Sequence, residues 1–337
     1  MVKINWDSLG FDVVPTKSMF KATCIQGGKW EGGSIIPYGN IELSPAANVL
    51  NYGQGAFEGV KAFRTVKNNI VLFRVDKNAE RMAFSTRRLC IPEMDVDFFI
   101  NAVLKTVKDN VDYIPPYGKG SLYIRPVVWG TSPGIGVKPA TDYTFMIFVS
   151  PVGPYFKKGL KPLNLKIANQ FHRAAPKGIG NIKAIGNYSA SLYPLAQAKK
   201  EGYDEVIYLD AVSEERIEET GSANLFIYKN GIIKTPPLSG SILGGVTRDS
   251  VCVISQKLLN IPVEESDVFI KDLEEADEVF CTGTAVVVSP IGKITFNEKT
   301  FEINKNQIGP ITNQIRGSIL GIQREESIDP YGWLKYL

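Results

Sequence analysis

The stretch GIGNIKAIGNY, residues 178–188, places one lysine, Lys183, among glycines, asparagines and short apolar residues. Glycine lets the backbone approach a ligand closely, and apolar surroundings lower a lysine pKa from its usual value of about 10.4. A neutral amine can form a Schiff base, so Lys183 is the candidate catalytic residue. The alternative is a glycine-rich surface turn with a solvated lysine. The stretch is neither a dinucleotide fingerprint, because Lys183 takes the third glycine position, nor a Walker motif.

Two other segments could bind a phosphate and a ring nitrogen. In SILGGVTRDS two glycines precede a predicted helix, whose first N–H groups, at Val246 and Thr247, would contact a phosphate. In EETGSANLF one carboxylate, Glu219, could face a pyridine nitrogen and keep it protonated. Many glycine-led helices bind nothing, and most acids in such a run are solvated. Pyridoxal phosphate is the cofactor that needs a Schiff-base lysine, a phosphate site and an acid together.

The elements that carry these segments alternate between strands and helices along the whole chain. Asp76 and Asp97 are expected to cap two helices in the first half of the chain. In the second half, the pair Asn230-Gly231 predicts a tight hairpin turn, because both central residues of such a turn need positive φ. We find no internal repeat and no low-complexity tract, so two α+β domains are expected.

The segment 151–162, PVGPYFKKGLKP, is rich in proline and glycine. It interrupts the hydrophobic periodicity of both strands and helices. Such a composition predicts an interdomain linker. We therefore expect a small N-terminal α+β domain over 1–150 and a larger, cofactor-binding α+β domain over 163–337.

Composition excludes several classes of protein. The chain has 337 residues, of which 44% are hydrophobic and 22% are charged, close to the globular average. Its net charge of +3 is too small for a basic stripe, so no nucleic-acid partner is expected. A single histidine, His172, and four cysteines without C-x-x-C spacing predict no metal site. The chain begins without a signal-peptide pattern and has no long apolar run, which predicts a cytoplasmic protein without a membrane partner.

Seven motifs resemble, in order and spacing, those of the branched-chain amino acid aminotransferases, which are fold-type IV pyridoxal phosphate enzymes. They are YGQGAFEGVKAF, DKNAERM, SLYIRPV, GIGNIKAIGNY, EETGSANLF, GGVTRDS and CTGTAVVVSP. The resemblance covers nearly the whole chain. It implies the two-domain fold of those enzymes and a homodimer whose active sites are shared across the interface. It also implies ping-pong transamination between leucine, isoleucine or valine and 2-oxoglutarate, so the small-molecule partners are amino acids and 2-oxo acids.

The same resemblance assigns the cofactor-binding residues. Lys183 would bind pyridoxal 5'-phosphate covalently and move the proton between the substrate Cα and the cofactor, and Glu219 would pair with the pyridine nitrogen. Tyr188 is similar to the tyrosine that hydrogen-bonds the phenolate oxygen. The phosphate ligands implied by the resemblance are Arg81, Val246, Thr247 and Thr284.

The implied substrate pocket must accept both a leucine and a glutamate side chain. Arg125 would bind the distal carboxylate of glutamate, and the backbone amides of Thr284 and Ala285 would bind the α-carboxylate. The apolar lining would come from Phe57, Tyr123 and Tyr155 and, across from the partner subunit, from Tyr52, Ile135 and Val137. The alternatives are core aromatics and, for Arg125, a core salt bridge.

The sequence differs from the mammalian members of this family at one motif, and other functions are compatible with the same residues. Mammalian members carry a C-x-x-C pair where this chain has Val286 and Ser289, so no thiol switch is expected. A D-amino acid aminotransferase, an aminodeoxychorismate lyase or a non-catalytic pyridoxal phosphate-binding protein could share the lysine, the acid and the phosphate site. Arg125 and the string YGQGAFEG favour the branched-chain function. The sequence does not rank leucine, isoleucine, valine, methionine and phenylalanine as amino donors.

Overall fold

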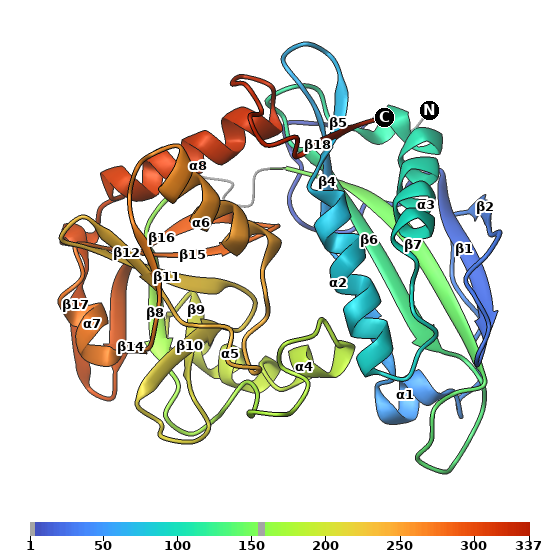
Figure 1. The fold of residues 1–337 in the computed structure, drawn as a ribbon, viewed down its shortest axis with the longest axis horizontal. Helices are drawn as coiled ribbons and strands as arrows, with labels where there is room; N and C mark the ends of the chain where they lie inside the picture. Colours follow the sequence, from blue (N-terminus) through green and yellow to red (C-terminus); the bar gives the residue numbers. More distant parts are fainter. Residues whose placement is uncertain (1–3, 154–158) are drawn as a thin grey trace. The chain divides into compact units, whose positions relative to one another are not determined.

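The computed structural model describes residues 4–153 and 159–337 (Figure 1). The described residues form two compact units. Unit 1 contains the described residues among the first 157, together with Ile182–Gly186 and Gly321–Leu337. Unit 2 contains the described residues from 159 to Asn181 and those of Asn187–Leu320. None of the described helices is long and apolar enough to cross a membrane.

Unit 1 is built on an antiparallel sheet whose strands do not follow one another in chain order. Its strands follow the order β18-β5-β4-β6-β7-β1-β2, with β3 paired to β6. The strands are β1 (Ser18–Ile25), β2 (Ser34–Pro37), β3 (Gly55–Phe57), β4 (Val60–Arg64), β5 (Ile70–Phe73), β6 (Ser121–Gly130), β7 (Asp142–Val152) and β18 (Leu334–Tyr336). The helices in this part of the chain are α1 (Asn48–Tyr52), α2 (Val75–Arg88), α3 (Val96–Asp109) and the short η1 (Val111–Tyr113).

Helices α2 and α3 cover one face of the unit 1 sheet (Figure 1). The core between these helices and the sheet contains fully buried side chains such as Met82, Phe99 and Phe145. Side chains alternate along a strand, so Ile124 points into this core while Tyr123 and Arg125 point to the opposite face of β6. That opposite face therefore carries residues that the sequence assigned to the substrate pocket.

The two predicted helix caps are wrong. Helix α2 follows β5 almost directly, its N-cap is Arg74 in a left-handed conformation, and Asp76 lies inside the first turn. Helix α3 is capped by Asp95, whose carboxylate accepts the Phe98 N–H, and Asp97 also lies in the first turn. Acidic side chains in a first turn stabilise a helix through its dipole, so sequence composition alone did not separate them from caps.

Unit 2 contains a second sheet with the order β13-β12-β11-β15-β16-β8-β9-β10-β14, and β17 pairs with β16. Its strands are β8 (Leu163–Ile167), β9 (Glu205–Leu209), β10 (Arg216–Thr220), β11 (Asn224–Lys229), β12 (Ile232–Thr235), β13 (Val263–Glu265), β14 (Val268–Phe269), β15 (Glu278–Gly283), β16 (Val287–Phe296) and β17 (Lys299–Glu302). The helices in the second half of the chain are α4 (Ile185–Ser189), α5 (Leu192–Lys200), α6 (Val246–Lys257), α7 (Ile270–Glu274), η2 (Asn304–Asn306) and α8 (Pro310–Gln323). The predicted turn between β11 and β12 is confirmed, since Asn230 and Gly231 have φ values of 50° and 83°.

The segment predicted as a linker, 151–162, overlaps a strand. Pro151 and Val152 are the last residues of β7 and pair with β6, while residues 154–158 of the predicted linker lie outside the described residues. The end of the chain belongs to unit 1, because β18 pairs with β5. The domain ranges 1–150 and 163–337 stay a prediction.

Candidate active site

Lys183 is held in unit 1 by its own backbone. Its N–H donates to the Ser85 hydroxyl of α2 at 3.2 Å, and its carbonyl accepts the Phe57 N–H at 3.1 Å. The side-chain amine lies 4.7 Å from the centroid of the Phe57 ring. Strand β3 and helix α2 therefore fix the lysine between them, which is not the solvated surface turn that the sequence left open.

The surroundings of Lys183 favour the neutral amine. Burial and, next, the positive charge of Arg81 lower the lysine pKa from 10.5 to about 8, against the opposing attraction of Glu58. An amine with this pKa is partly unprotonated near neutral pH and can act as a nucleophile or a base.

Arg81 and Glu58 form a buried ion pair beside the lysine. Arg81 Nε lies 2.7 Å from Glu58 Oε1, and Nη2 lies 2.8 Å from Oε2. Asn78, one turn earlier on α2, donates to the same carboxylate at 2.8 Å. Burial opposes the ionisation of Glu58, but the Arg81 guanidinium holds its pKa below the usual range. Sequence reasoning missed Glu58, although an acid between the apolar strands β3 and β4 was an available signal.

Arg125 lies among aromatic rings. Its Nη2 donates to the Tyr123 hydroxyl at 3.0 Å, and its guanidinium carbon lies 4.7 Å from the Phe57 ring centroid. The buried Nε has no hydrogen-bond partner among the described residues. No carboxylate of the described chain pairs with Arg125, so the structure gives no core salt bridge there. An anionic ligand would satisfy this buried donor.

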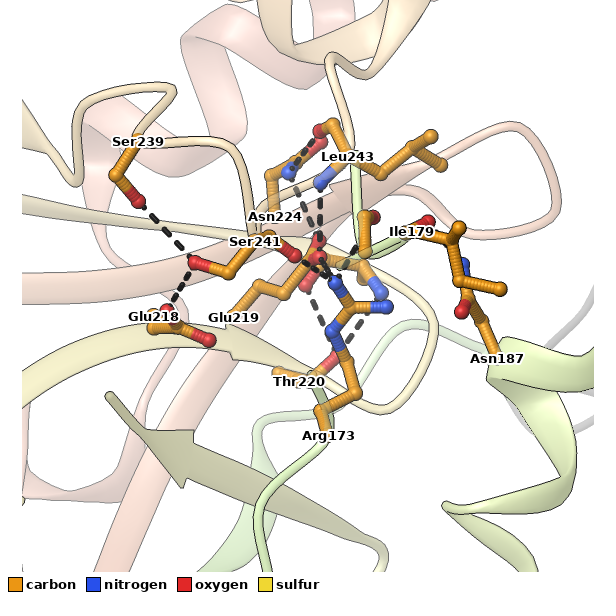
Figure 2. A network of polar contacts seen from close by, with 12 residues as sticks. Arg173, Ile179, Asn187, Glu218, Glu219, Thr220, Asn224, Ser239, Ser241 and Leu243 are labelled. Atoms are coloured by element: carbon orange, nitrogen blue, oxygen red, sulfur yellow. Dashed lines mark hydrogen bonds and ion pairs between the residues drawn. The ribbon is translucent and has the colours of Figure 1, made fainter. Parts of the chain in front are cut away.

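Glu219 is the centre of a second buried cluster, in unit 2. Figure 2 shows its carboxylate between Arg173, Asn224 and Leu243. One oxygen lies 2.8 Å from Arg173 Nη2 and accepts the Leu243 N–H at 3.0 Å, and the other oxygen accepts from Asn224 Nδ2 at 3.0 Å. The side chains of both Glu219 and Arg173 are only 5% exposed.

Arg173, which sequence reasoning also missed, contacts several members of this cluster. Its Nη2 donates to the carbonyl of Gly180 at 3.1 Å and to that of Ser241. The Ser241 hydroxyl donates in turn to Glu218, whose pKa is raised by burial (Figure 2). Arg173 therefore connects the carboxylate to both glycine-rich segments of unit 2. Its place ten residues before the lysine was no signal by itself.

The start of α6 lies next to Glu219. Asn224 donates to the Leu243 carbonyl at 2.8 Å, and a Cβ on Gly245 would displace the Asn224 side chain from this position, because it would clash with Asn224 Oδ1. Gly245 is the N-cap and provides no side-chain cap, which leaves the first turn at Val246 and Thr247 open to a ligand acceptor.

Thr284 and Ala285 lie in the hairpin between β15 and β16. Strand β11 begins at Asn224, which pairs with Thr282 near the end of β15. The hairpin, the acid and the start of α6 are thus neighbours within unit 2. Tyr188 lies in α4 and is half-buried.

The residues predicted to reach a partner subunit lie on the surface of unit 1. The Tyr52 hydroxyl donates to the Ile135 carbonyl, and the side chains of Ile135 and Val137 are among the most exposed apolar groups, at 92% and 87%. Tyr155 lies outside the described residues.

Each cluster, taken by itself, contains groups that suit a part of pyridoxal phosphate. Unit 1 supplies a buried lysine with a lowered pKa and a second cation, Arg81. Unit 2 supplies an anchored carboxylate beside a glycine-led helix start. No group of three or more potential metal ligands occurs within the described residues.

Comparison with known proteins decides the family. Residues 55–294 match the amino-transferase class IV family. The chloroplastic branched-chain-amino-acid aminotransferase 5 of Arabidopsis thaliana is 46% identical over 99% of this chain and 80% of that protein. The mitochondrial branched-chain amino acid aminotransferase 1 of Humulus lupulus is 45% identical, over 98% and 84%. The chain belongs to the branched-chain amino acid aminotransferases of class IV. A methionine aminotransferase of Arabidopsis thaliana is 40% identical, over 98% and 92%.

Solved structures agree with this family. The branched-chain amino acid aminotransferase of Escherichia coli has a TM-score of 0.82 at 28% identity and covers 95% of this chain and 99% of its own. The enzyme of Thermoproteus uzoniensis with norvaline has a TM-score of 0.77 at 28% identity, with coverage of 94% and 99%. A further branched-chain amino acid aminotransferase, solved with pyridoxamine 5'-phosphate, has a TM-score of 0.81 at 27% identity, with coverage of 96% and 99%. The predicted family, the fold-type IV α+β fold and the aminotransferase class are confirmed.

The predicted cytoplasmic location is wrong. Three plant relatives that are 45–46% identical to this chain are named as chloroplastic or mitochondrial enzymes. The prediction relied on the residues at the start of the chain, and these do not report the compartment of the family.

Proposed function

We propose that this enzyme binds pyridoxal 5'-phosphate and transfers amino groups between branched-chain L-amino acids and 2-oxoglutarate by a ping-pong mechanism. The observation that carries this proposal is the buried Lys183 amine, with a pKa of about 8, in a chain of this family. Methionine is a further donor to test, because a methionine aminotransferase is 40% identical to this chain.

Lys183 is the residue that performs the proton transfer. When bound, the cofactor supplies an electron sink that stabilises negative charge on the substrate Cα. The neutral Lys183 amine would take the proton from Cα as a general base and, as the resulting ammonium, would deliver it to the cofactor carbon C4′ as a general acid. Arg81 disfavours the charged ammonium and so keeps the amine ready for this role.

The remaining cofactor ligands come from both clusters. Glu219 pairs with the pyridine nitrogen, as its rigid anchoring by Arg173 and the Leu243 amide supports. The phosphate is bound by Arg81 and, at the start of α6 and the following hairpin, by Val246, Thr247 and Thr284. Tyr188 hydrogen-bonds the phenolate oxygen.

Different residues bind the charged and the apolar parts of the substrate. The Thr284 and Ala285 amides bind the α-carboxylate, and Arg125 binds the distal carboxylate of glutamate through the donors that no described carboxylate occupies. Phe57 and Tyr123 line the apolar part of the pocket.

A partner subunit completes the pocket in this proposal. Tyr52, Ile135 and Val137 reach the active site of the second subunit of a homodimer. The exposure of Ile135 and Val137 in the single chain supports this assignment, since burying two large apolar side chains stabilises an interface.

The visible absorption spectrum of the purified holoenzyme tests the function directly. L-Leucine alone should bleach the yellow colour, and 2-oxoglutarate should restore it, as two separate half-reactions require. D-Alanine and L-methionine serve as parallel donors. Bleaching by D-alanine but not by L-leucine would favour the D-amino acid aminotransferase, and a coloured protein that no amino acid bleaches would be a non-catalytic binder.

A further inference from the structure

The hairpin that carries Thr284 and Ala285 has an unusual backbone. Gly283 pairs with Val287 across it, which leaves a three-residue loop, 284–286. Short hairpin loops of this kind commonly contain a residue in the left-handed conformation, and glycine is favoured at that position. Here the left-handed residue is Val287, with φ 63°, directly after the loop. A β-branched residue at positive φ is a genuine outlier, so the surrounding structure must impose this conformation.

Arg316 of α8 contacts the backbone on both sides of Val287. Its Nη1 donates to the Val286 carbonyl at 2.7 Å and to the Val288 carbonyl at 2.6 Å. The helix itself is anchored, since Ile315 and Ile319 are fully buried. One guanidinium nitrogen on a fixed helix therefore sets the direction of the two carbonyls that flank the strained residue.

We propose that Arg316 is a positioning residue for recognition of the substrate α-carboxylate. By holding Val287 in its left-handed conformation, it fixes the 284–286 loop so that the Thr284 and Ala285 amides point to the ligand. This inference rests on the proposed function, in which those two amides bind the carboxylate. Arg316 acts through the loop and does not touch the substrate.

The reason is preorganisation. A backbone N–H binds a carboxylate well only when its direction is fixed before the ligand arrives, and a misplacement of about 1 Å can cost about 100-fold. A loop that has to maintain a left-handed valine without Arg316 would relax toward unstrained conformations and turn its amides away.

The test uses the holoenzyme and two probes that differ in one group. The first probe is 4-methylpentanoate, a leucine-like carboxylate without the amine, with binding measured by the change in visible absorption. The second is 3-methylbutylamine, a leucine-like amine without the carboxylate, with its half-reaction measured by bleaching. The variant Arg316→Met should weaken 4-methylpentanoate binding by roughly 10- to 100-fold and change the amine reaction by less than about threefold. Arg316→Lys should retain part of the affinity, and Gln314→Ala, an exposed change on α8, should retain all of it.

Strain gives a second, independent measurement. Glycine adopts positive φ without steric cost, so the double variant Val287→Gly with Arg316→Met should bind 4-methylpentanoate better than Arg316→Met alone. Unchanged carboxylate binding in Arg316→Met, or equal losses for the carboxylate and the amine, would overturn the proposal. If Arg316→Met does not fold, the same comparison with Arg316→Lys decides it. A wild-type enzyme that does not bleach with L-leucine would instead overturn the proposed function.

Discussion

Each unit buries a carboxylate against an arginine, and the two pairs differ in what surrounds them. Glu58 and Arg81 in unit 1 have a lysine beside them, and burial and then the positive charge of Arg81 lower the pKa of that lysine, against the opposing attraction of Glu58. Glu219 and Arg173 in unit 2 are surrounded by backbone groups and an amide side chain instead. Unit 1 thus uses burial and charge to set the protonation of an amine, whereas unit 2 uses fixed hydrogen bonds to hold a carboxylate in place.

This difference separates two tasks of an aminotransferase. A residue that moves a proton has to change its charge easily, which a cluster of cations promotes by destabilising the ammonium. A residue that pairs with a ring nitrogen has to keep its charge and its place, which several donors on one carboxylate ensure.

The largest effect is expected from Lys183→Ala. Loss of the proton-transfer group should reduce transamination by about 1000-fold or more, while weak cofactor binding persists. Turnover of L-leucine with 2-oxoglutarate, together with the bound-cofactor spectrum, measures both. Lys177→Ala, an exposed lysine close in sequence, is the control. Activity above a tenth of wild type in Lys183→Ala would remove the catalytic assignment.

Neutralising each buried carboxylate compares the two clusters directly. Glu219→Gln should lower kcat by about 100-fold, because the ring nitrogen loses its anionic partner. Glu58→Gln should lower kcat by only about 10-fold, because Glu58 acts through its neighbours. Breaking a buried ion pair costs about 3–5 kcal/mol, so both variants should also unfold at lower temperature. Glu215→Gln, exposed just before β10, is the control. Equal losses of kcat would show that the two carboxylates are not divided as described.

Arg125→Met should act on one substrate and not on the other. A hydrogen-bonded charge contributes about 1.5–3 kcal/mol, so KM for 2-oxoglutarate should rise roughly 10- to 100-fold while KM for L-leucine changes little. Steady-state kinetics with each substrate varied separately provide the measurement. Arg87→Met, whose side chain is 64% exposed, serves as the matched control. A parallel rise in both KM values would assign Arg125 to structure rather than to recognition.

The smallest effect is a shift in a pH profile. The apoenzyme should capture pyridoxal phosphate faster as pH rises, with a midpoint near the Lys183 pKa of about 8 rather than 10.5, because only the neutral amine attacks. Glu58 raises this pKa, so Glu58→Gln should move the midpoint to lower pH. Stopped-flow absorption measures the rate. A midpoint near 10.5, or an upward shift in Glu58→Gln, would contradict the electrostatic role of the unit 1 cluster.

Sequence reasoning predicted best the features that depend on the backbone conformation of adjacent residues. The Asn230-Gly231 turn and the glycine-led start of α6 depend on residues next to one another, and both are present. The caps of α2 and α3 were each missed by two residues, because several polar residues near a helix start are compatible with the same pattern. The partners Glu58 and Arg173 were missed altogether, because their signal was a single charged residue without a visible counterpart.

The sequence by itself determined the family, the fold-type and the aminotransferase class, since seven ordered motifs carry them. Only the tertiary structure decided which charges meet. Arg81 lies 23 residues from Glu58 and Glu219 lies 46 residues from Arg173, yet each pair is buried in contact. Arg316 likewise reaches Val286 from another element, 30 residues away. Burial and charge pairing arise from packing between distant segments, and the pKa of Lys183 follows from that packing rather than from its neighbours in the chain.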